Sequence, residues 1–290
     1  MTTKVAIKAR AKINLTLDVI GKRPDGYHDV EMIMQQINLF DLVTISKREG
    51  DADIVITSSD LFLPKNEGNL AYLAAKQMMT QFNLPTGFDI HIEKNIPVSA
   101  GLAGGSTDAA AVIVGISMLM DENVPLEMLE TIGLRIGADV PFCIRGNCCI
   151  ARGLGEKLEP IQGLSQMWIV LVKPNFGVST KEVYTHLNLE EVKEKPDTQA
   201  MVQALLTQDK NKIVNNLCNV LETVTLKRYP EVEHLKSQLV SFGADGVLMS
   251  GSGPTVFGLF KNLNRAKLAH KNIKRFFNQS YIVTAYNGEI

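Results

Sequence analysis

The sequence predicts an α+β fold with mixed sheets and helices, divided into two domains. Strand-like and helix-like segments are mixed along the chain and do not alternate strictly, which argues against a doubly wound parallel sheet. The chain has 290 residues, too many for one minimal core and suited to two packed domains or one large unit. We place the boundary within 160–174, which gives domains 1–160 and 161–290.

The first sixty residues predict mainly strands, because apolar and polar side chains alternate there with a period of two. The predicted strands are 5–9, 13–19, 42–45 and 54–56. Proline and glycine within 23–26 predict a turn after the second strand. The period then becomes helical, and we predict a helix over 69–82 with Asn69 as its N-cap.

The remaining elements follow from the same patterns. Residues 88–92 alternate as a strand, and a long apolar helix is predicted over about 105–120 after a glycine-rich loop. A second helix, about 126–136, ends near Gly137. The apolar run 168–172 indicates a buried strand. The other predictions are a mostly helical stretch at 180–240 with an exposed connection at 188–198, strands at 247–249, 256–260 and 281–285, and a helix at 264–277.

Charge and composition limit the classes of partner and the compartment that we expect for this protein. The formal net charge is −1, so no overall field attracts nucleic acid or an anionic membrane. The N-terminus lacks an apolar signal core, and no segment approaches the roughly 18 apolar residues of a membrane helix. The spacing of the four cysteines matches no zinc pattern and favours free thiols in a reducing compartment. We therefore expect a cytoplasmic protein.

One glycine-rich segment carries the strongest chemical signal, because a predicted strand leads into it and a predicted helix leads out. Its residues are Pro97, Val98, Ser99, Ala100, Gly101, Leu102, Ala103, Gly104, Gly105, Ser106 and Thr107. Glycines let the backbone approach a ligand closely, and a helix N-terminus offers N–H groups and a positive dipole end. Hydroxyls at its end are able to donate to phosphate or to reach a magnesium ion. The segment predicts a phosphate site.

Two commoner nucleotide loops are excluded for this segment. It lacks the Gly-Lys-Ser/Thr ending of a Walker A loop, and it lacks the G-x-G-x-x-G fingerprint of a dinucleotide fold. Taken alone, a glycine-rich helix start packed against a sheet explains the same residues.

Three further segments have both a functional and a structural explanation. Lys12 and Asn14 share one face of a strand, as an active-site pair or as lysine protection of a sheet edge. Asp139 lies between Gly137-Ala138 and an apolar run, so it either points into a cleft or caps a turn. The glycine turn 250–255 is a third candidate, although hairpin turns use the same residues.

Taken together and in this order, these segments resemble the superfamily of galactokinase, homoserine kinase, mevalonate kinase and phosphomevalonate kinase. The central motif of that superfamily corresponds to Pro97–Thr107, and its C-terminal glycine motif corresponds to Ser250–Thr255. The resemblance implies a two-domain small-molecule kinase fold, with the ATP site in the interdomain cleft and Pro97–Thr107 around the phosphates.

The resemblance narrows to one branch through Ala11–Leu15, Arg23–His28 and Gly137–Phe142, and it extends over about residues 8–285. That branch transfers the γ-phosphate of ATP to the 2-hydroxyl of a methylerythritol linked to cytidine diphosphate, in the non-mevalonate route to isoprenoid precursors. Carried over by motif, Asp139 is the catalytic base or orienting group, and Lys12 lies between that carboxylate and the transferring phosphate. A cation there keeps Asp139 ionised and lowers the barrier for the charge that develops on the hydroxyl.

The substrate-binding residues implied by the resemblance are Asn14, Tyr27, His28 and Tyr184. Aromatic rings stack on a base, and histidine is able to hydrogen-bond its edge, so Tyr27 and His28 suit a cytidine pocket. Tyr184 would form a second aromatic wall. Packing of the turn is the structural alternative for Tyr27 and His28.

We expect ATP and Mg²⁺ as cofactors, a small-molecule substrate with a cytidine diphosphate group, and a monomer or weak homodimer. We predict no protein metal ligand, no nucleic-acid partner and no membrane partner. Another kinase of the superfamily, of homoserine or mevalonate type, and a nucleotide-binding protein without catalysis remain the alternatives.

Overall fold

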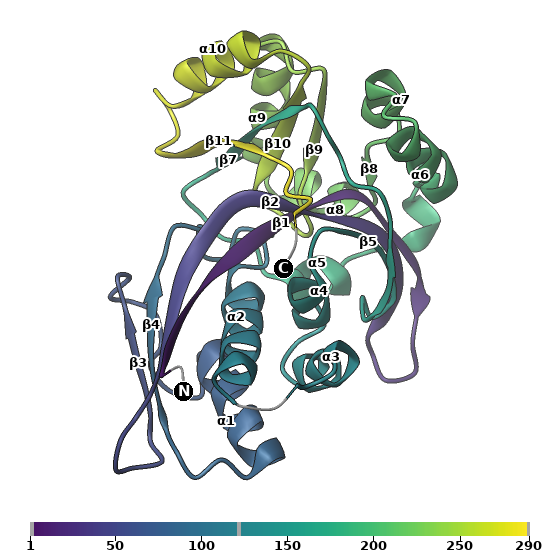
Figure 1. Ribbon diagram of the computed structural model, residues 1–290. Helices are drawn as coiled ribbons and strands as arrows, with labels where there is room; N and C mark the ends of the chain where they lie inside the picture. The colour runs from purple at the N-terminus through teal and green to yellow at the C-terminus, as the bar shows by residue number, and fades with distance from the viewer. Residues whose placement is uncertain (1–2, 121–122, 289–290) are drawn as a thin grey trace. The chain divides into compact units, whose positions relative to one another are not determined.

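The structure is a computed structural model that describes residues 3–120 and 123–288 (Figure 1). The backbone forms two compact units that share the chain in interleaved segments. Unit 1 contains the residues up to Ala11, Leu39–Ile96 and Ala103–Gly146, and unit 2 contains Lys12–Asn38, Pro97–Leu102 and the residues from Asn147 onward. The predicted division at residue 160 follows the linear chain and stays a prediction.

The sheet of unit 1 is mixed. Strands β1 (Lys4–Lys22) and β2 (His28–Lys47) extend through both units, and in unit 1 the end of β2 pairs antiparallel with β4 (Phe88–Glu93). Strand β3 (Ile54–Ser58) pairs with β4 in parallel. Side chains of β4 alternate between buried and exposed, which confirms the strand predicted from its period of two.

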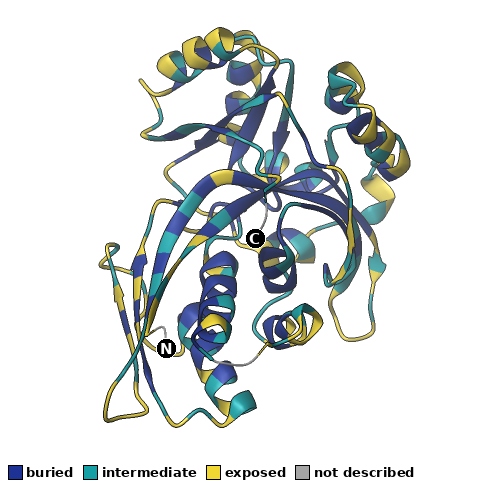
Figure 2. Cartoon of the chain, viewed as in Figure 1, coloured by how far each residue is buried: buried dark blue, intermediate teal, exposed yellow. Residues whose placement is uncertain are grey.

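Four helices complete unit 1. They are α1 (Leu70–Phe82), α2 (Gly104–Leu119), α3 (Leu126–Leu134) and α4 (Val140–Arg145). Asn69 caps α1 by accepting from the Ala71 amide, as the sequence predicted. Helix α2 contacts α1 and α4 and is largely buried, as Figures 1 and 2 show. At Gly115 a side chain would lie 2.5 Å from Ile45 Cδ1, so the glycine lets α2 lie close to β2.

Unit 2 contains a four-stranded antiparallel sheet. Its strand order is β11 (Gln279–Thr284), β7 (Trp168–Lys173), β10 (Val256–Phe260) and β9 (Gly246–Met249). Helix α9 (Pro230–Ser241) packs against β9 and β10, and α10 (Leu263–Ile273) packs against β7 and β11. Strand β10 is buried along its whole length and β7 along nearly all of it, and both are dark blue in Figure 2. The predicted C-terminal strands and helix are thereby confirmed.

The rest of unit 2 joins the other halves of β1 and β2 to shorter elements. Strand β2 pairs antiparallel with β5 (Cys148–Gly153), which pairs with β6 (Lys157–Pro160), and β1 pairs in parallel with β8 (Cys218–Asn219). The remaining helices are α5 (Thr180–Thr185), η1 (Leu189–Glu191), α6 (Thr198–Leu206), α7 (Lys210–Asn215) and α8 (Glu222–Arg228). The mostly helical prediction for 180–240 is confirmed, with β8 as an interruption.

The N-terminal strands are longer than the sequence predicted. The two strands predicted at 5–9 and 13–19 are one strand, β1, and β2 begins at His28 although only 42–45 was predicted. Consecutive buried glutamines hide the signal of β2, since they break the alternation of apolar and polar residues. Gln35 Nε2 donates to the carbonyl of Tyr286, and Gln36 Oε1 accepts from the Asn147 amide. Burial is tolerated because these amides are hydrogen-bonded.

Across the described ranges 3–120 and 123–288, no helix has both the length and the apolar character needed to cross a membrane.

Gly87 precedes β4 and lies very close to the backbone of Asp53. A Cβ at this position would lie 2.0 Å from the carbonyl oxygen of Asp53 and 2.5 Å from its amide nitrogen. Because both atoms belong to backbone, a side chain fits only if β3 or β4 shifts. We expect Gly87→Ala to lower the free energy of unfolding by about 1–3 kcal/mol in urea denaturation.

Gly21 is the matched control, since a Cβ there meets nothing within 4 Å. Gly21→Ala should change the free energy of unfolding by less than about 0.5 kcal/mol. Equal stability of the two variants would contradict the close backbone approach at Gly87.

Candidate active site

The glycine-rich segment connects β4 to α2, and its backbone is bent at several positions. Gly101 adopts a φ of 74°, and the non-glycine residues Ser99 and Ala103 adopt 51° and 59°. Positive φ is costly for residues with a side chain and persists where surrounding structure enforces it. The segment is therefore a shaped loop up to Ala103 that continues into the first turn of α2.

The N-terminus of α2 is open to an anion. Its N-cap is Ala103, whose side chain makes no capping hydrogen bond. Helical geometry leaves the N–H groups of the first turn without intrahelical partners, and the helix dipole adds partial positive charge there. Ser106 is half-buried in this turn, whereas the Thr107 hydroxyl is buried and donates to the Arg10 carbonyl at 2.8 Å. Thr107 thus anchors the helix to β1.

The first half of the segment packs on the C-terminal glycine turn, and both belong to unit 2. Ser250 Oγ donates to the carbonyl oxygen of Gly101 at 3.0 Å. A Cβ on Gly101 would lie 2.3 Å from the Ser250 carbonyl oxygen, so only glycine fits this approach. Two motifs far apart in the sequence are therefore in direct contact.

Lys12 lies beside the same two motifs. Its side chain is 4% exposed, its Nζ donates to Asn14 Oδ1 at 2.8 Å, and its backbone amide donates to the Leu102 carbonyl. The Cβ position of Gly251 lies 3.5 Å from Nζ. Strand β1 has β2 and β8 as its neighbours. Because Lys12 is buried and its ammonium group donates to Asn14, protection of an exposed sheet edge was the wrong alternative for this residue.

Asn14 is fully buried and lies behind the ammonium group. In addition to accepting from Lys12, it donates through Nδ2 to Met32 Sδ at 3.2 Å. These contacts orient Lys12, as a buried amide with both ends engaged fixes its neighbour's rotamer. Direct contact of Asn14 with a substrate stays a prediction.

The aromatic residues predicted to bind a base come together in unit 2. The rings of His28 and Tyr184 lie 5.2 Å apart between centroids, at an interplanar angle of 38°. Tyr184 lies on α5, and Tyr27 is 65% exposed. Burial, and secondarily the charge of Lys22, lowers the pKa of His28 below its ordinary value. The imidazole is therefore neutral at pH 7 and offers one donor and one acceptor.

The turn before Tyr27 is stiffened by its own charges. Arg23 is ion-paired with both Asp25 and Asp29 at 3.1 Å, and Asp25 accepts from the Tyr27 amide at 3.0 Å. The Arg23 amide donates to the Tyr27 carbonyl at 2.8 Å, which closes the turn. Tyr27 and His28 are thus held by backbone bonds while the Tyr27 ring stays accessible.

Asp139 belongs to unit 1 and stands at the N-cap position of α4. Its side chain makes no capping hydrogen bond to that helix, although its carbonyl accepts from the Cys143 amide at 3.1 Å. Turn capping of α4 was therefore not the reason for an aspartate here. The carboxylate is half-buried, and its catalytic role stays a prediction.

One residue that holds the glycine turn, Asn219, was not predicted from the sequence. Asn219 on β8 donates through Nδ2 to the carbonyls of Met249 at 2.9 Å and Gly251 at 2.8 Å, and accepts from the Leu221 amide. It therefore holds the glycine turn that faces Lys12. A two-residue strand has no measurable period, and the only signal was a lone asparagine among apolar residues.

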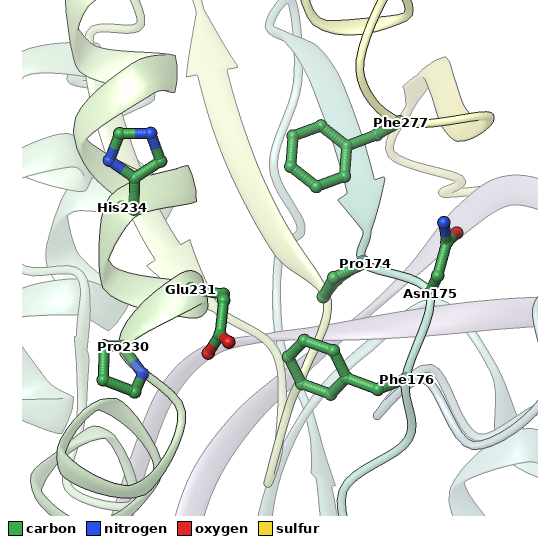
Figure 3. Close-up of a pocket in the computed structure, with 7 residues that line it drawn as sticks. All are labelled: Pro174, Asn175, Phe176, Pro230, Glu231, His234 and Phe277. Atoms are coloured by element: carbon green, nitrogen blue, oxygen red, sulfur yellow. The ribbon is translucent and has the colours of Figure 1, made fainter.

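A separate pocket in unit 2 does not include any predicted site residue. It has a volume of about 540 Å³ and is mostly apolar. In Figure 3 the rings of Phe176 and Phe277 face it from the segments after β7 and α10, and His234 and Glu231 face it from α9. Among the residues the structure describes, no group of three or more His, Cys, Asp or Glu side chains is arranged to hold a metal ion.

Comparison with known families agrees with this architecture. The family model for the N-terminal domain of GHMP kinases matches residues 69–147, and the model for the GHMP kinase C-terminal domain matches 201–279. The predicted α+β kinase fold is thereby confirmed. A homoserine kinase from Cytophaga hutchinsonii has a TM-score of 0.78 at 19% identity, covering 99% of this chain and 96% of that one, and shows the same fold.

Relatives of higher identity narrow the family. The 4-diphosphocytidyl-2-C-methyl-D-erythritol kinase of Alkaliphilus metalliredigens is 46% identical over 98% of this chain and 97% of its own. That of a Geobacillus species is 48% identical over 97% and 96%. A crystal structure of 4-(cytidine 5'-diphospho)-2C-methyl-D-erythritol kinase superimposes with a TM-score of 0.83 at 30% identity, covering 98% of this chain and 100% of that one. Over nearly its whole length, this chain belongs to the 4-diphosphocytidyl-2-C-methyl-D-erythritol kinase family within the GHMP kinases.

Proposed function

We propose that this protein transfers the γ-phosphate of ATP to the 2-hydroxyl of 4-diphosphocytidyl-2-C-methyl-D-erythritol, in the non-mevalonate route to isoprenoid precursors. Full-length relatives that carry this kinase name support the proposal. The observation that carries it in this chain is the ring contact between His28 and Tyr184, at 5.2 Å. Two rings from distant segments form a wall suited to a pyrimidine base.

Phosphate binding is assigned to Pro97–Thr107. The open N-terminus of α2 supplies N–H groups, and Gly101 and Gly104 keep side chains away from the backbone. Phosphoryl transfer depends mainly on positioning and on stabilisation of charge. The loop therefore serves to fix the triphosphate relative to the acceptor hydroxyl.

Lys12 and Asp139 are proposed as the catalytic residues. Asn14 holds the Lys12 ammonium at 2.8 Å in a buried setting, where a positive charge interacts strongly with a transferring phosphate. Asp139 would accept the proton of the 2-hydroxyl or orient that hydroxyl for attack.

Magnesium would be held by phosphate oxygens and by water, and the Ser106 hydroxyl, half-buried in the first turn of α2, would contact it through water. When bound, the ion neutralises negative charge between the β- and γ-phosphates.

The cytidine end of the substrate is assigned to Tyr27, His28 and Tyr184. Neutral His28 is able to donate to one edge atom of cytosine and accept from another, while Tyr184 supports the imidazole from the side. We further propose a monomer or weak homodimer in the cytoplasm. The free thiols of Cys148 and Cys218 suit a reducing compartment.

Substrate choice tests the proposed function directly. The protein is incubated with ATP and magnesium and one of three alcohols, namely the cytidine-diphosphate-linked methylerythritol, homoserine or mevalonate, and ADP release is followed. We expect turnover with the first alcohol alone. Turnover with homoserine or mevalonate would assign another GHMP activity, and ATP binding without turnover would support a non-catalytic protein.

Replacement of Asp139 tests the catalytic assignment. Asp139→Ala removes the group that accepts or orients the hydroxyl proton, and we expect kcat to fall by about 10²–10⁴-fold. Circular dichroism and urea denaturation serve as the folding control. A kcat close to that of the unmodified protein would remove Asp139 from the mechanism.

Replacement of the aromatic wall tests cytidine recognition. Tyr184→Ala should raise KM for the cytidine substrate by about tenfold, the equivalent of one stacked ring, while KM for ATP stays unchanged. Tyr184→Phe keeps the ring and is the matched control. Equal KM values for Tyr184→Ala and Tyr184→Phe would contradict a ring-based role.

The protonation state of His28 adds a pH dependence. Because its pKa lies below the ordinary value of about 6.5, His28 stays neutral through pH 7 and gains a proton only in more acidic solution. KM for the cytidine substrate should therefore be constant from pH 7 to 8 and rise only at a pH below the ordinary histidine pKa of about 6.5. The rise should be absent in His28→Gln, measured by initial rates at saturating ATP.

A further inference from the structure

Three buried charged side chains meet in unit 1 next to the glycine-rich segment. Lys94, Asp41 and Asp108 have side-chain exposures of 7%, 0% and 2%. Lys94 Nζ is ion-paired with Asp41 Oδ2 and lies 2.7 Å from Asp108 Oδ2. None of the roles assigned above uses these residues, which are called the Lys94 cluster here.

The cluster fixes the backbone on the N-terminal side of the phosphate loop. Asp41 Oδ1 accepts hydrogen bonds from two consecutive amides, Asn95 at 2.5 Å and Ile96 at 2.8 Å. The Asn95 side chain in turn donates to the Phe40 carbonyl at 3.2 Å. The chain leaves unit 1 directly after Ile96, so Asp41 fixes the last two residues of unit 1 before the loop begins.

The same cluster fixes the backbone on the C-terminal side of the loop. Asp108 lies one helical turn after Gly104 on α2. Because Cα–Cβ bonds tilt toward the N-terminus of a helix, the Asp108 side chain leans toward Gly104. A Cβ on Gly104 would lie 3.6 Å from Lys94 Nζ and 3.2 Å from Ile96 Cγ2. The ammonium group therefore lies against the first residue of α2, one residue after the chain returns to unit 1 at Ala103.

Burial and the neighbouring charges shift the pKa values of two side chains in the cluster. Burial, reinforced by the charge of Asp41 and opposed by Lys94, raises the pKa of Asp108 to about 8. Burial lowers the pKa of Lys94, but the charges of Asp108 and Asp41 outweigh it and leave that pKa above its ordinary value. One ammonium group contacts both carboxyl groups, and these direct polar contacts limit the cost of burying the three side chains.

We propose that Lys94, Asp41 and Asp108 are positioning residues for ATP, which hold Ile96 and Gly104 at a fixed separation before the nucleotide binds. The inference rests on the proposal that Pro97–Thr107 binds the triphosphate. A loop whose two ends are already ordered loses less conformational freedom on binding than one with free ends. The cluster thus acts on ATP affinity through the backbone, without touching the nucleotide.

Lys94→Met tests this role, because it removes the cation that joins the two carboxyl groups. Dissociation constants for ATP are measured by calorimetry without the alcohol substrate, and kcat is measured at saturating ATP. We expect ATP to bind about tenfold more weakly and kcat to stay within about threefold, since preorganisation affects binding more than chemistry. Lys94→Arg keeps the charge and should restore affinity.

Lys76→Met is the matched control, since Lys76 pairs with Glu67 on the exposed surface of unit 1 and should leave ATP affinity unchanged. Amide hydrogen exchange over 95–106 adds a readout of the loop ends, and it should accelerate in Lys94→Met alone. Unchanged ATP affinity in folded Lys94→Met, with only a lower melting temperature, would overturn the proposal and leave a purely structural cluster.

If Lys94→Met does not fold, Asp108→Asn tests whether the Lys94 cluster affects ATP affinity. The amide keeps the shape and weakens the link to Lys94, and ATP affinity should fall by about threefold or more. Affinity equal to that of the unmodified protein would overturn the inference. Failure of the unmodified protein to bind ATP would instead reject the proposed function, so the two outcomes are distinct.

Discussion

The burial of one ammonium group, that of Lys12, organises the site more than any other interaction. A buried amine loses its hydration, and polar partners must compensate for that loss. Asn14 supplies one such partner at 2.8 Å, and the Lys12 amide engages the Leu102 carbonyl. The glycine turn lies close by, since a Cβ on Gly251 would be 3.5 Å from Nζ. The glycines themselves are required by the backbone: Gly251 and Gly101 adopt φ of 57° and 74°, and a Cβ on Gly101 would meet the Ser250 carbonyl oxygen.

Small polar residues recur around the glycine turn and hold it in place. Asn219 fixes two of its carbonyls, Ser250 donates to Gly101, and Thr180 shares a hydrogen bond of 2.8 Å with Ser252. A turn held from three directions leaves little freedom to the neighbouring glycine-rich loop. Preorganised polar groups of this kind are what phosphoryl transfer requires, since the reaction gains little from flexible partners.

Local patterns predicted the parts of the fold whose signals are local. The alternation of 88–92, the Asn69 cap and the apolar run at 168–172 each correspond to an observed element. The motif order predicted the kinase family. Hydrogen bonds between residues far apart in the sequence were not predicted. Gln35 and Gln36 are buried because they bond to the distant backbone of Tyr286 and Asn147, and a single sequence does not reveal such pairs. Lys94, Asp41 and Asp108 escaped for the same reason: each is an ordinary charged residue until the fold joins them.

The interleaving of the two units has a consequence for protein engineering. Segments of unit 1 end at Ala11 and Ile96, and the unit resumes at Leu39 and Ala103. Its segments therefore alternate with those of unit 2 before residue 147. A linear cut at any position in this region separates residues that share a unit from one another. Chimeras between relatives should therefore exchange whole sets of segments and not contiguous halves. By the same logic, a half-length fragment is a poor candidate for independent expression, and insertions are better directed to surface turns within one unit.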